Sequence, residues 1–234
     1  MPLLMPLPNK HKLKAIHSRN NMKWLLLIWV GFYSLGNAQN TYNKYLTQVQ
    51  KQREQLAQKQ LNTKVLNDCS QLLYNAFAEE IFPAWLGTPW DFNGISNEPQ
   101  KGKIACGYFV STTLKHLGSN LNRYKVAQQA SATIVKAFAP NQTKKFYSLD
   151  QLTNYLYCQD DQIYVLGLDY HVGFILIQNQ QSFFVHSDYF HNQVVKEPIE
   201  NSIGLQNNQL YVLGSITKNK HFLKKWLLGS RFYH

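Results

Sequence analysis

One cysteine and two histidines stand where their side chains could do chemistry together. Cys106 follows a stretch of turn-forming residues and opens the segment 106–117, whose apolar residues recur at helical spacing before Gly118. The unpaired N–H groups at a helix N-terminus favour a thiolate, the form in which cysteine acts as a nucleophile. The pattern therefore predicts a nucleophile at Cys106, and a small, buried, inert thiol is the competing interpretation.

His171 and His186 belong to two predicted strands that follow one another in the chain. His171 opens the strand 171–178, and His186 lies near the end of the strand 182–189. An imidazole at the end of a sheet, partly exposed, can serve as general base for a thiol on a neighbouring helix. A second imidazole can accept the remaining ring N–H and fix its tautomer. We expect His186 in that orienting role, with Asp188 as the alternative.

Three short segments resemble the motifs of the NlpC-type peptidases, papain-like cell-wall hydrolases. Residues 105–110 read Ala-Cys-Gly-Tyr-Phe-Val where that family has Asp-Cys-Ser-Gly-Phe-Val. Residues 171–175 read His-Val-Gly-Phe-Ile against His-Val-Gly-Ile-Tyr, and residues 184–187 read Phe-Val-His-Ser against Phe-Ile/Val-His-Ala. The order Cys, His, His agrees with the family, and the resemblance spans roughly residues 87–190.

The resemblance implies an exported thiol protease or amidase that cleaves an amide bond in peptidoglycan stem peptides through Cys106, His171 and His186. The family places a Tyr hydroxyl near the oxyanion, where this chain has the segment 90–94. Trp90 lacks a hydroxyl, so its indole N–H or the Asn93 amide would substitute. Tyr108 and Asp188 complete the residues expected at the oxyanion or substrate. Positions 105, 107 and 108 differ from the family motif. We expect these differences to affect the choice of substrate more than the catalytic triad.

Two rival functions stay open at this point. The same fold could act on another amide, as a protein or small-molecule amidase. A catalytically silent binding domain could also keep the fold while its flanking motif positions drift. Rapid alkylation of Cys106 at neutral pH would favour either enzyme over the silent domain.

The N-terminal segment has the order of a secretory signal. Basic residues end at Lys23, an apolar run covers 24–35, and Gly36-Asn37-Ala38 offers small residues for a cut after Ala38. We expect residues 1–38 to be a signal peptide, with Met22 as an alternative start and an uncleaved anchor as the alternative fate. The mature chain would then be periplasmic or extracellular, in loose association with the cell envelope.

The net charge falls once this segment is set aside. Five of the 24 Lys and Arg precede residue 39, where there is no acid, which leaves 19 basic against 13 acidic residues, or +6 in place of +11. No basic stripe interleaved with aromatics marks a nucleic-acid track, so we expect a peptide-like partner, no nucleic acid and a monomer. No Cys-x-x-Cys or His-Glu-x-x-His motif is present, and we expect no cofactor and no metal. His116 is expected on the surface.

With three cysteines in an exported chain, at least one cysteine has no disulfide partner within the chain. Either Cys69 and Cys158 form a disulfide and Cys106 stays free, or all three are thiols.

Helical and strand periodicities predict an α+β fold, of papain-like NlpC type by the resemblance, with N-terminal helices packed on an antiparallel sheet. A helical segment should occupy 39–86 and the catalytic domain 87–234. The expected helices cover 39–60, 65–82, 106–117, 125–138, a segment opening at Ser148, and 220–228. The expected strands cover 162–168, 171–178, 182–189, 193–199 and 210–217.

Overall fold

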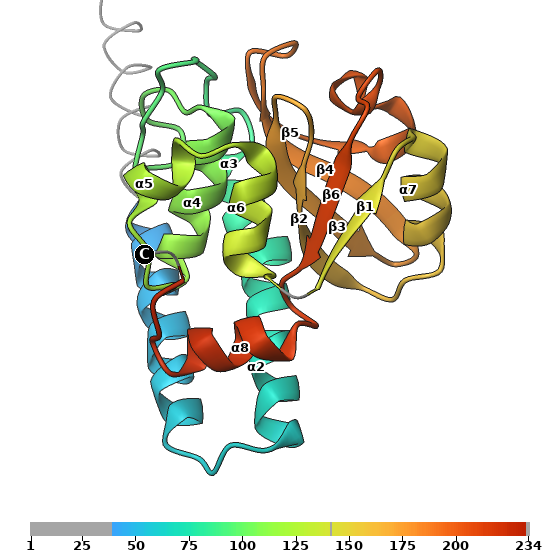
Figure 1. The fold of residues 1–234 in the computed structure, drawn as a ribbon. Helices are drawn as coiled ribbons and strands as arrows, with labels where there is room; N and C mark the ends of the chain where they lie inside the picture. Colours follow the sequence, from blue (N-terminus) through green and yellow to red (C-terminus); the bar gives the residue numbers. More distant parts are fainter. Residues whose placement is uncertain (1–38, 141, 233–234) are drawn as a thin grey trace, which may run out of the picture. The chain divides into compact units, whose positions relative to one another are not determined.

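The computed structural model describes residues 39–140 and 142–232. The predicted signal peptide, residues 1–38, lies outside the described residues. The chain divides into two compact units, Met1–Asn43 and Lys44–His234, and the second unit carries the fold shown in Figure 1. Within the described ranges, no helix is long and apolar enough to cross a membrane. The predicted boundary between 39–86 and 87–234 stays a prediction.

The N-terminal part of the second unit is helical, as predicted. Residues 39–57 are helical, close to the predicted 39–60, and α2 (Thr63–Asn75) follows, with the Asn62 side chain accepting a hydrogen bond from the Val65 N–H. The chain then continues without a break through the π-helical turn η1 (Ala76–Ile81) into α3 (Phe82–Trp85). Pro83 lies where the π-helical turn passes into α3, and the helix runs to Trp85, a few residues beyond the predicted end at 82.

Helix α4 (Cys106–His116) begins at the residue that the sequence predicts. Gly118 adopts a positive φ of 88° just after it, which confirms Gly118 as the helix stop. The single helix predicted over 125–138 is wrong, because two helices, α5 (Arg123–Ala127) and α6 (Ser131–Phe138), lie there. The Asn122 side chain caps α5 and shifts its start, while the Ser131 hydroxyl donates to the Leu168 carbonyl and fixes α6 independently.

The C-terminal half forms a six-stranded antiparallel sheet in the order β1-β6-β2-β3-β4-β5. The five predicted strands are confirmed with small changes at their ends, and β1 was not predicted. Their bounds are β1 Thr143–Phe146, β2 Gln162–Gly167, β3 Val172–Gln178, β4 Gln181–Asp188, β5 Gln193–Pro198 and β6 Tyr211–Ser215. Two short 3-10 turns, η2 (Ile199–Asn201) and η3 (Ile203–Leu205), connect β5 towards β6.

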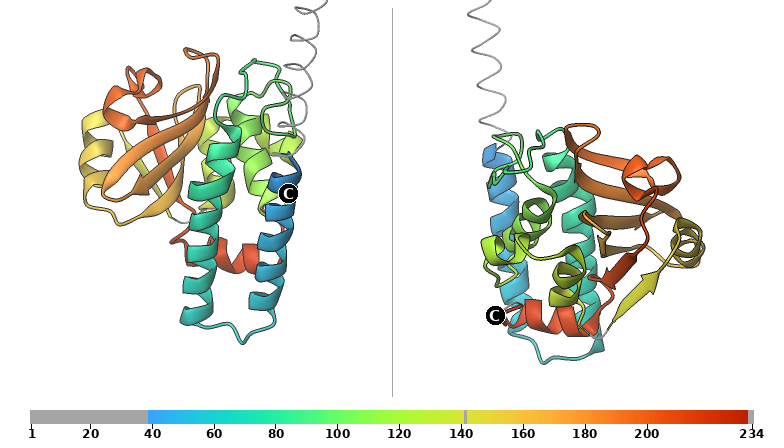
Figure 2. Two further views of the ribbon diagram at one scale, coloured as in Figure 1. Left: turned by 180° about the vertical axis from the view of Figure 1, so that it is seen from behind. Right: turned by 45° about the horizontal axis from the view of Figure 1, so that its top comes forward.

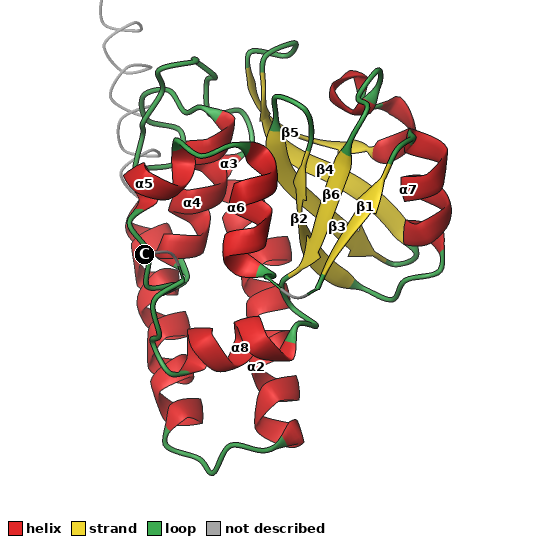
Figure 3. Ribbon diagram, viewed as in Figure 1, coloured by secondary structure: helices red, strands yellow, loops and turns green. Residues whose placement is uncertain are grey.

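Helices cover both faces of this sheet (Figures 1 and 3). On one face α4 and α6 pack against the central strands, and the ring centroids of Phe174 in β3 and Phe109 in α4 lie 5.8 Å apart. On the other face α7 (Leu149–Tyr157) contributes Leu152 and Leu156 to a buried cluster with Ile175. Adjacent residues of β3 thus enter different cores, as alternation along a strand requires.

Two helix caps follow from local sequence. Ser148 accepts from the Gln151 N–H at the start of α7, which confirms the helix predicted to open there, and the Gln151 side chain accepts from the Tyr147 N–H, a variant of the capping box. Asn219 caps α8 (Lys220–Leu227), which lies beside α2 in Figure 2. The Trp226 indole of α8 donates to the Leu117 carbonyl at 2.6 Å, which ties the chain's last helix to the end of the Cys106 helix.

Candidate active site

Cys106 is the first residue of α4, and Ala105 at the N-cap offers no side chain to cap the helix. Burial raises the pKa of the Cys106 thiol, although the backbone N–H groups of Val172, Gly107 and Cys106 itself act in the opposite direction. The helix start was expected to favour the thiolate. Burial opposes this expectation and is the larger effect, because the charged form loses more solvation than the backbone N–H groups restore. The direction of the shift favours the protonated thiol at rest.

Gly107 explains one departure from the NlpC-type motif, which has Ser at this position. A Cβ built on Gly107 would lie 2.4 Å from the Ala127 carbonyl oxygen, a contact that no Cβ makes. Helices α4 and α5 therefore approach one another closely at the residue after the cysteine. Only glycine permits this approach, so the α4–α5 packing of this chain is incompatible with the family's Ser.

The expected contact between the two imidazoles is present. His171 Nε2 lies 2.8 Å from His186 Nδ1, across the adjacent strands β3 and β4. One of these nitrogens donates and the other accepts. Since Nε2 of His171 is engaged in this way, Nδ1 is the ring nitrogen that is left for a thiol proton. The Val172 N–H, next to His171 in the chain, contacts the Cys106 sulfur, which puts the start of β3 against the start of α4.

His171 is half-buried, in line with the partly exposed imidazole that the sequence predicts. Burial, together with a smaller effect of the neighbouring His186, lowers the pKa of His171 to about 3. With the Cys106 thiol protonated and the His171 imidazole neutral, the resting pair carries no net charge. Both pKa shifts favour this neutral pair over the predicted thiolate, and from it a proton moves when the sulfur attacks.

The His186 ring is fully buried between two neighbours, Phe184 and Gly173. It stacks on Phe184 with ring centroids 3.9 Å apart and an interplanar angle of 19°. Gly173 on the adjacent strand leaves room for it, since a Cβ there would lie 2.7 Å from both His186 Cβ and Phe184 Cε2. The glycine of the His-Val-Gly segment therefore has a packing role that fixes His186.

We expect Gly173→Ala to lower both stability and activity. The added methyl group must displace His186 or Phe184, and such overpacking costs about 1–3 kcal/mol. Urea denaturation should show this loss, and kcat should fall roughly tenfold or more as the imidazole pair is misaligned. Gly229→Ala is the control, because a Cβ at Gly229 meets nothing within 4 Å although its φ of 65° is strained. Equal kcat values in the two variants at matched stability would contradict the packing role.

Asp188, the alternative to His186, lies close by but bonds elsewhere. Its Oδ2 accepts from the His191 N–H at 2.8 Å and contacts His191 Nδ1 at 2.6 Å. Its Oδ1 is 3.8 Å from His186 Nδ1, beyond hydrogen-bond distance. The group in contact with His171 is therefore His186. Sequence reasoning missed Glu197, whose Oε1 lies 3.1 Å from His186 Nε2.

A cavity of about 640 Å³ opens in front of Cys106 and His171. The predicted oxyanion and substrate residues Trp90, Asn93, Tyr108 and Asp188 also line it. His186 does not line the cavity, which fits a group that acts through His171. The lining of the cavity includes four aromatic side chains that are 57–99% exposed: Phe92, Tyr170, Tyr189 and Phe190.

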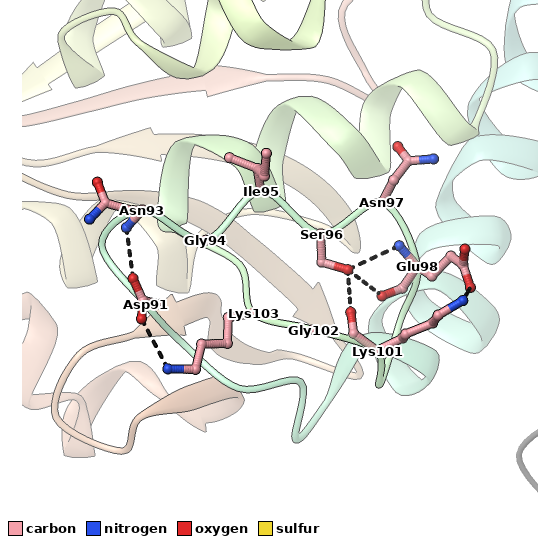
Figure 4. A pocket seen from close by; sticks show the side chains of 10 residues that line it. All are labelled: Asp91, Asn93, Gly94, Ile95, Ser96, Asn97, Glu98, Lys101, Gly102 and Lys103. Atoms are coloured by element: carbon pink, nitrogen blue, oxygen red, sulfur yellow. Dashed lines mark hydrogen bonds and ion pairs between the residues drawn. The ribbon is translucent and has the colours of Figure 1, made fainter. Parts of the chain in front are cut away.

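The loop that precedes Cys106 is held by its own polar contacts (Figure 4). Ser96 Oγ donates to the carbonyl oxygens of Glu98 and Lys101, and Lys103 forms an ion pair with Asp91 at 3.0 Å. The buried Arg123 of α5 donates to the Ile95 carbonyl at 2.8 Å. The loop residues line a second, open pocket of about 490 Å³, and these contacts hold the segment that carries Asn93.

The remaining cysteines and His116 differ in their settings. All three cysteines are free thiols, with Cys69 buried and Cys158 exposed, so the alternative with three thiols holds in the described chain. His116 was expected on the surface, but it is half-buried with its ring centroid 6.1 Å from that of Trp85. The helix end turns it inwards.

Among the described residues, no cluster of three or more His, Cys, Asp and Glu side chains could hold a metal ion.

Two half-buried histidines predict a loss of stability in acid. Burial lowers the pKa of His116 to about 4 and that of His171 to about 3, whereas an unfolded histidine titrates near 6.5. The unfolded chain therefore binds more protons, and the stability that these neutral rings provide is present above pH ~6.5 and lost as the pH falls towards 3.

The midpoint of urea denaturation should fall between pH 7.5 and 5.0. His116→Gln should reduce the slope, whereas His221→Gln, at an exposed position of α8, should leave it unchanged. A midpoint that does not change with pH over this interval would contradict the buried neutral rings.

No family model and no curated protein matches this chain. Two solved structures show a loose likeness. One is a protein of the DUF1460 family from Legionella pneumophila str. Philadelphia 1, with 9% identity, a TM-score of 0.37, and coverage of 74% of this chain and 94% of that one. The other is an N-acetylmuramoyl-L-alanine amidase from Bacteroides uniformis, with 10% identity, a TM-score of 0.34, and coverage of 58% and 95% respectively.

Proposed function

We propose that this protein is an exported cysteine hydrolase of NlpC type that cleaves an amide bond. One observation carries the proposal: a cysteine at a helix start and an imidazole bonded to a second imidazole at 2.8 Å face the same cavity. The nucleophile is Cys106, the base is His171, and His186 orients the base. The papain-like NlpC fold is part of this proposal, as is the export that residues 1–38 would direct.

The reaction begins from the neutral pair. As Cys106 Sγ attacks the carbonyl carbon, the thiol proton passes to His171 Nδ1 and the sulfur keeps the electron pair. The Cys106 backbone N–H, with a donor from Trp90 or Asn93, stabilises the oxyanion. The tetrahedral intermediate collapses, the amine leaves with the proton from His171, and water releases the acyl group by the same steps in reverse.

The substrate follows from the resemblance rather than from the geometry. We propose an amide in a peptidoglycan stem peptide, acted on by a monomer in loose association with the cell envelope and without a cofactor or nucleic acid. A cavity of about 640 Å³ with exposed aromatic side chains in its lining supports a ligand larger than a single amino acid.

Digestion of purified peptidoglycan tests the proposal. Liquid chromatography with mass spectrometry should detect new products with free amines, in amounts that grow with time and are absent with Cys106→Ala. If peptidoglycan stays intact while other peptide amides are cleaved through Cys106, the substrate part of the proposal is wrong. If no amide is cleaved and Cys106 reacts with electrophiles only as fast as a free thiol, the chain is a silent binding domain.

A further inference from the structure

A carboxylate on β5 lies directly behind the imidazole pair. Glu197 Oε1 is 3.1 Å from His186 Nε2, and its side chain is only 14% exposed. In the sheet register, His186 is opposite Val195 and Glu197 is opposite Phe184, so Glu197 is the diagonal neighbour of His186 on the same face. Three groups thus form one hydrogen-bonded line from His171 through His186 to Glu197.

This line determines where the ring protons sit. Burial raises the pKa of Glu197, but the contacts with His186 and Ser202 together outweigh it and the pKa is lowered, so Glu197 is a carboxylate that can only accept. In its neutral form, His186 then carries its proton on Nε2 and accepts at Nδ1. His171 in turn must donate from Nε2, which leaves the lone pair of its Nδ1 for the thiol proton.

The same carboxylate also favours the charge that develops during attack. When His171 Nδ1 takes the thiol proton, the ring becomes an imidazolium in a buried position that disfavours charge. Transfer of its Nε2 proton to His186 Nδ1 moves the positive charge one ring further. There it lies 3.1 Å from Glu197 Oε1 and 3.8 Å from Asp188 Oδ1.

We propose that Glu197 is a positioning residue that fixes the tautomers of His186 and His171, so that His171 presents a proton acceptor to Cys106. This inference rests on the proposed function of Cys106 and His171. Asp188 does not fill the role, because its Oδ2 is bound to His191 and its Oδ1 is beyond hydrogen-bond distance of His186. Glu197 does not line the cavity, so it acts through His186 and not on the substrate.

The test reads the tautomers by NMR of ¹⁵N-histidine-labelled protein, with signals assigned by single histidine replacements. In the parent protein His171 and His186 should both be protonated at Nε2. In Glu197→Ala a substantial Nδ1-protonated population should appear in both rings. Glu197→Gln should show a smaller population, since the amide can present either its oxygen or its NH₂ group. Glu200→Gln, an exposed carboxylate on the adjacent turn, should change nothing.

Activity provides the second readout. Against whichever amide is turned over, Glu197→Ala should lower kcat by roughly tenfold with little change in KM, and Glu197→Gln by less. Parent-like tautomers in Glu197→Ala, or in Glu197→Gln if the alanine variant does not fold, would overturn the inference. Changed tautomers in a chain that cleaves no amide would leave the inference intact and contradict the proposed function alone.

Discussion

Cys106→Ala is expected to lower amide turnover by about 10⁴-fold or more while the fold is retained. The sulfur is the atom that bonds to the carbonyl carbon, and no other side chain of the cavity can replace it. The residue lies at a helix start and is partly exposed, so loss of Sγ should change the free energy of unfolding by only about 1 kcal/mol. Steady-state kinetics and urea denaturation of the same preparation measure both quantities.

Cys158→Ala is the matched control, because Cys158 is exposed and lies at the end of α7, away from the cavity. It should retain parent-like activity and stability. Proportional losses of activity and stability in Cys106→Ala would instead identify Cys106 as a packing residue. Residual activity close to that of the parent would remove it from the mechanism.

His186→Ala is expected to lower kcat by roughly 10²-fold, less than the loss of Cys106, since the thiol and the oxyanion donors remain. The alanine variant leaves His171 Nε2 without its buried acceptor and frees the ring to take the wrong tautomer or rotate. His186→Asn can place its amide oxygen where His186 Nδ1 was, so that His171 Nε2 keeps a hydrogen-bond acceptor. This variant should therefore retain more activity than His186→Ala. Comparison of kcat for the two variants at equal stability measures this orienting role.

Stability must be measured alongside, because His186 is fully buried between Phe184 and Gly173. His191→Ala is a suitable control, since it removes an exposed imidazole near the same strand end but outside the line to His171. Parent-like activity in His186→Ala would exclude the orienting role. Equal activity in the alanine and asparagine variants would show that the acceptor oxygen does not matter.

Much of the architecture is readable from local pattern. The buried strands β2 and β3 have unmistakable apolar runs, and the start of α4 at Cys106 follows from the turn residues before it. β1 escaped prediction because an edge strand with two lysines has little apolar surface to bury. The break between α5 and α6 depends in part on the Ser131 hydroxyl donating to the Leu168 carbonyl, a contact between residues that are distant in sequence.

The site divides in the same way. The motif spacing indicates Cys106, His171 and His186, because each stands at the end of a recognisable element. Glu197 carries no sequence signal, since only the register of β4 with β5 brings it to His186. The raised pKa of the Cys106 thiol was also beyond local reasoning, because helix-end electrostatics can be read from position whereas burial of the sulfur depends on the whole fold.

Labelling with an active-site-directed electrophile tests the central claim most directly. A short stem-peptide analogue carrying an acyloxymethyl ketone in place of the scissile amide should alkylate the nucleophile irreversibly, and peptide mapping by mass spectrometry locates the bond. We predict one equivalent on Cys106, with slow labelling in His171→Ala and none on Cys158. Labelling of Cys158 in preference to Cys106, or an unmodified Cys106 in protein that the reagent has inactivated, would contradict the assignment of Cys106 as the nucleophile.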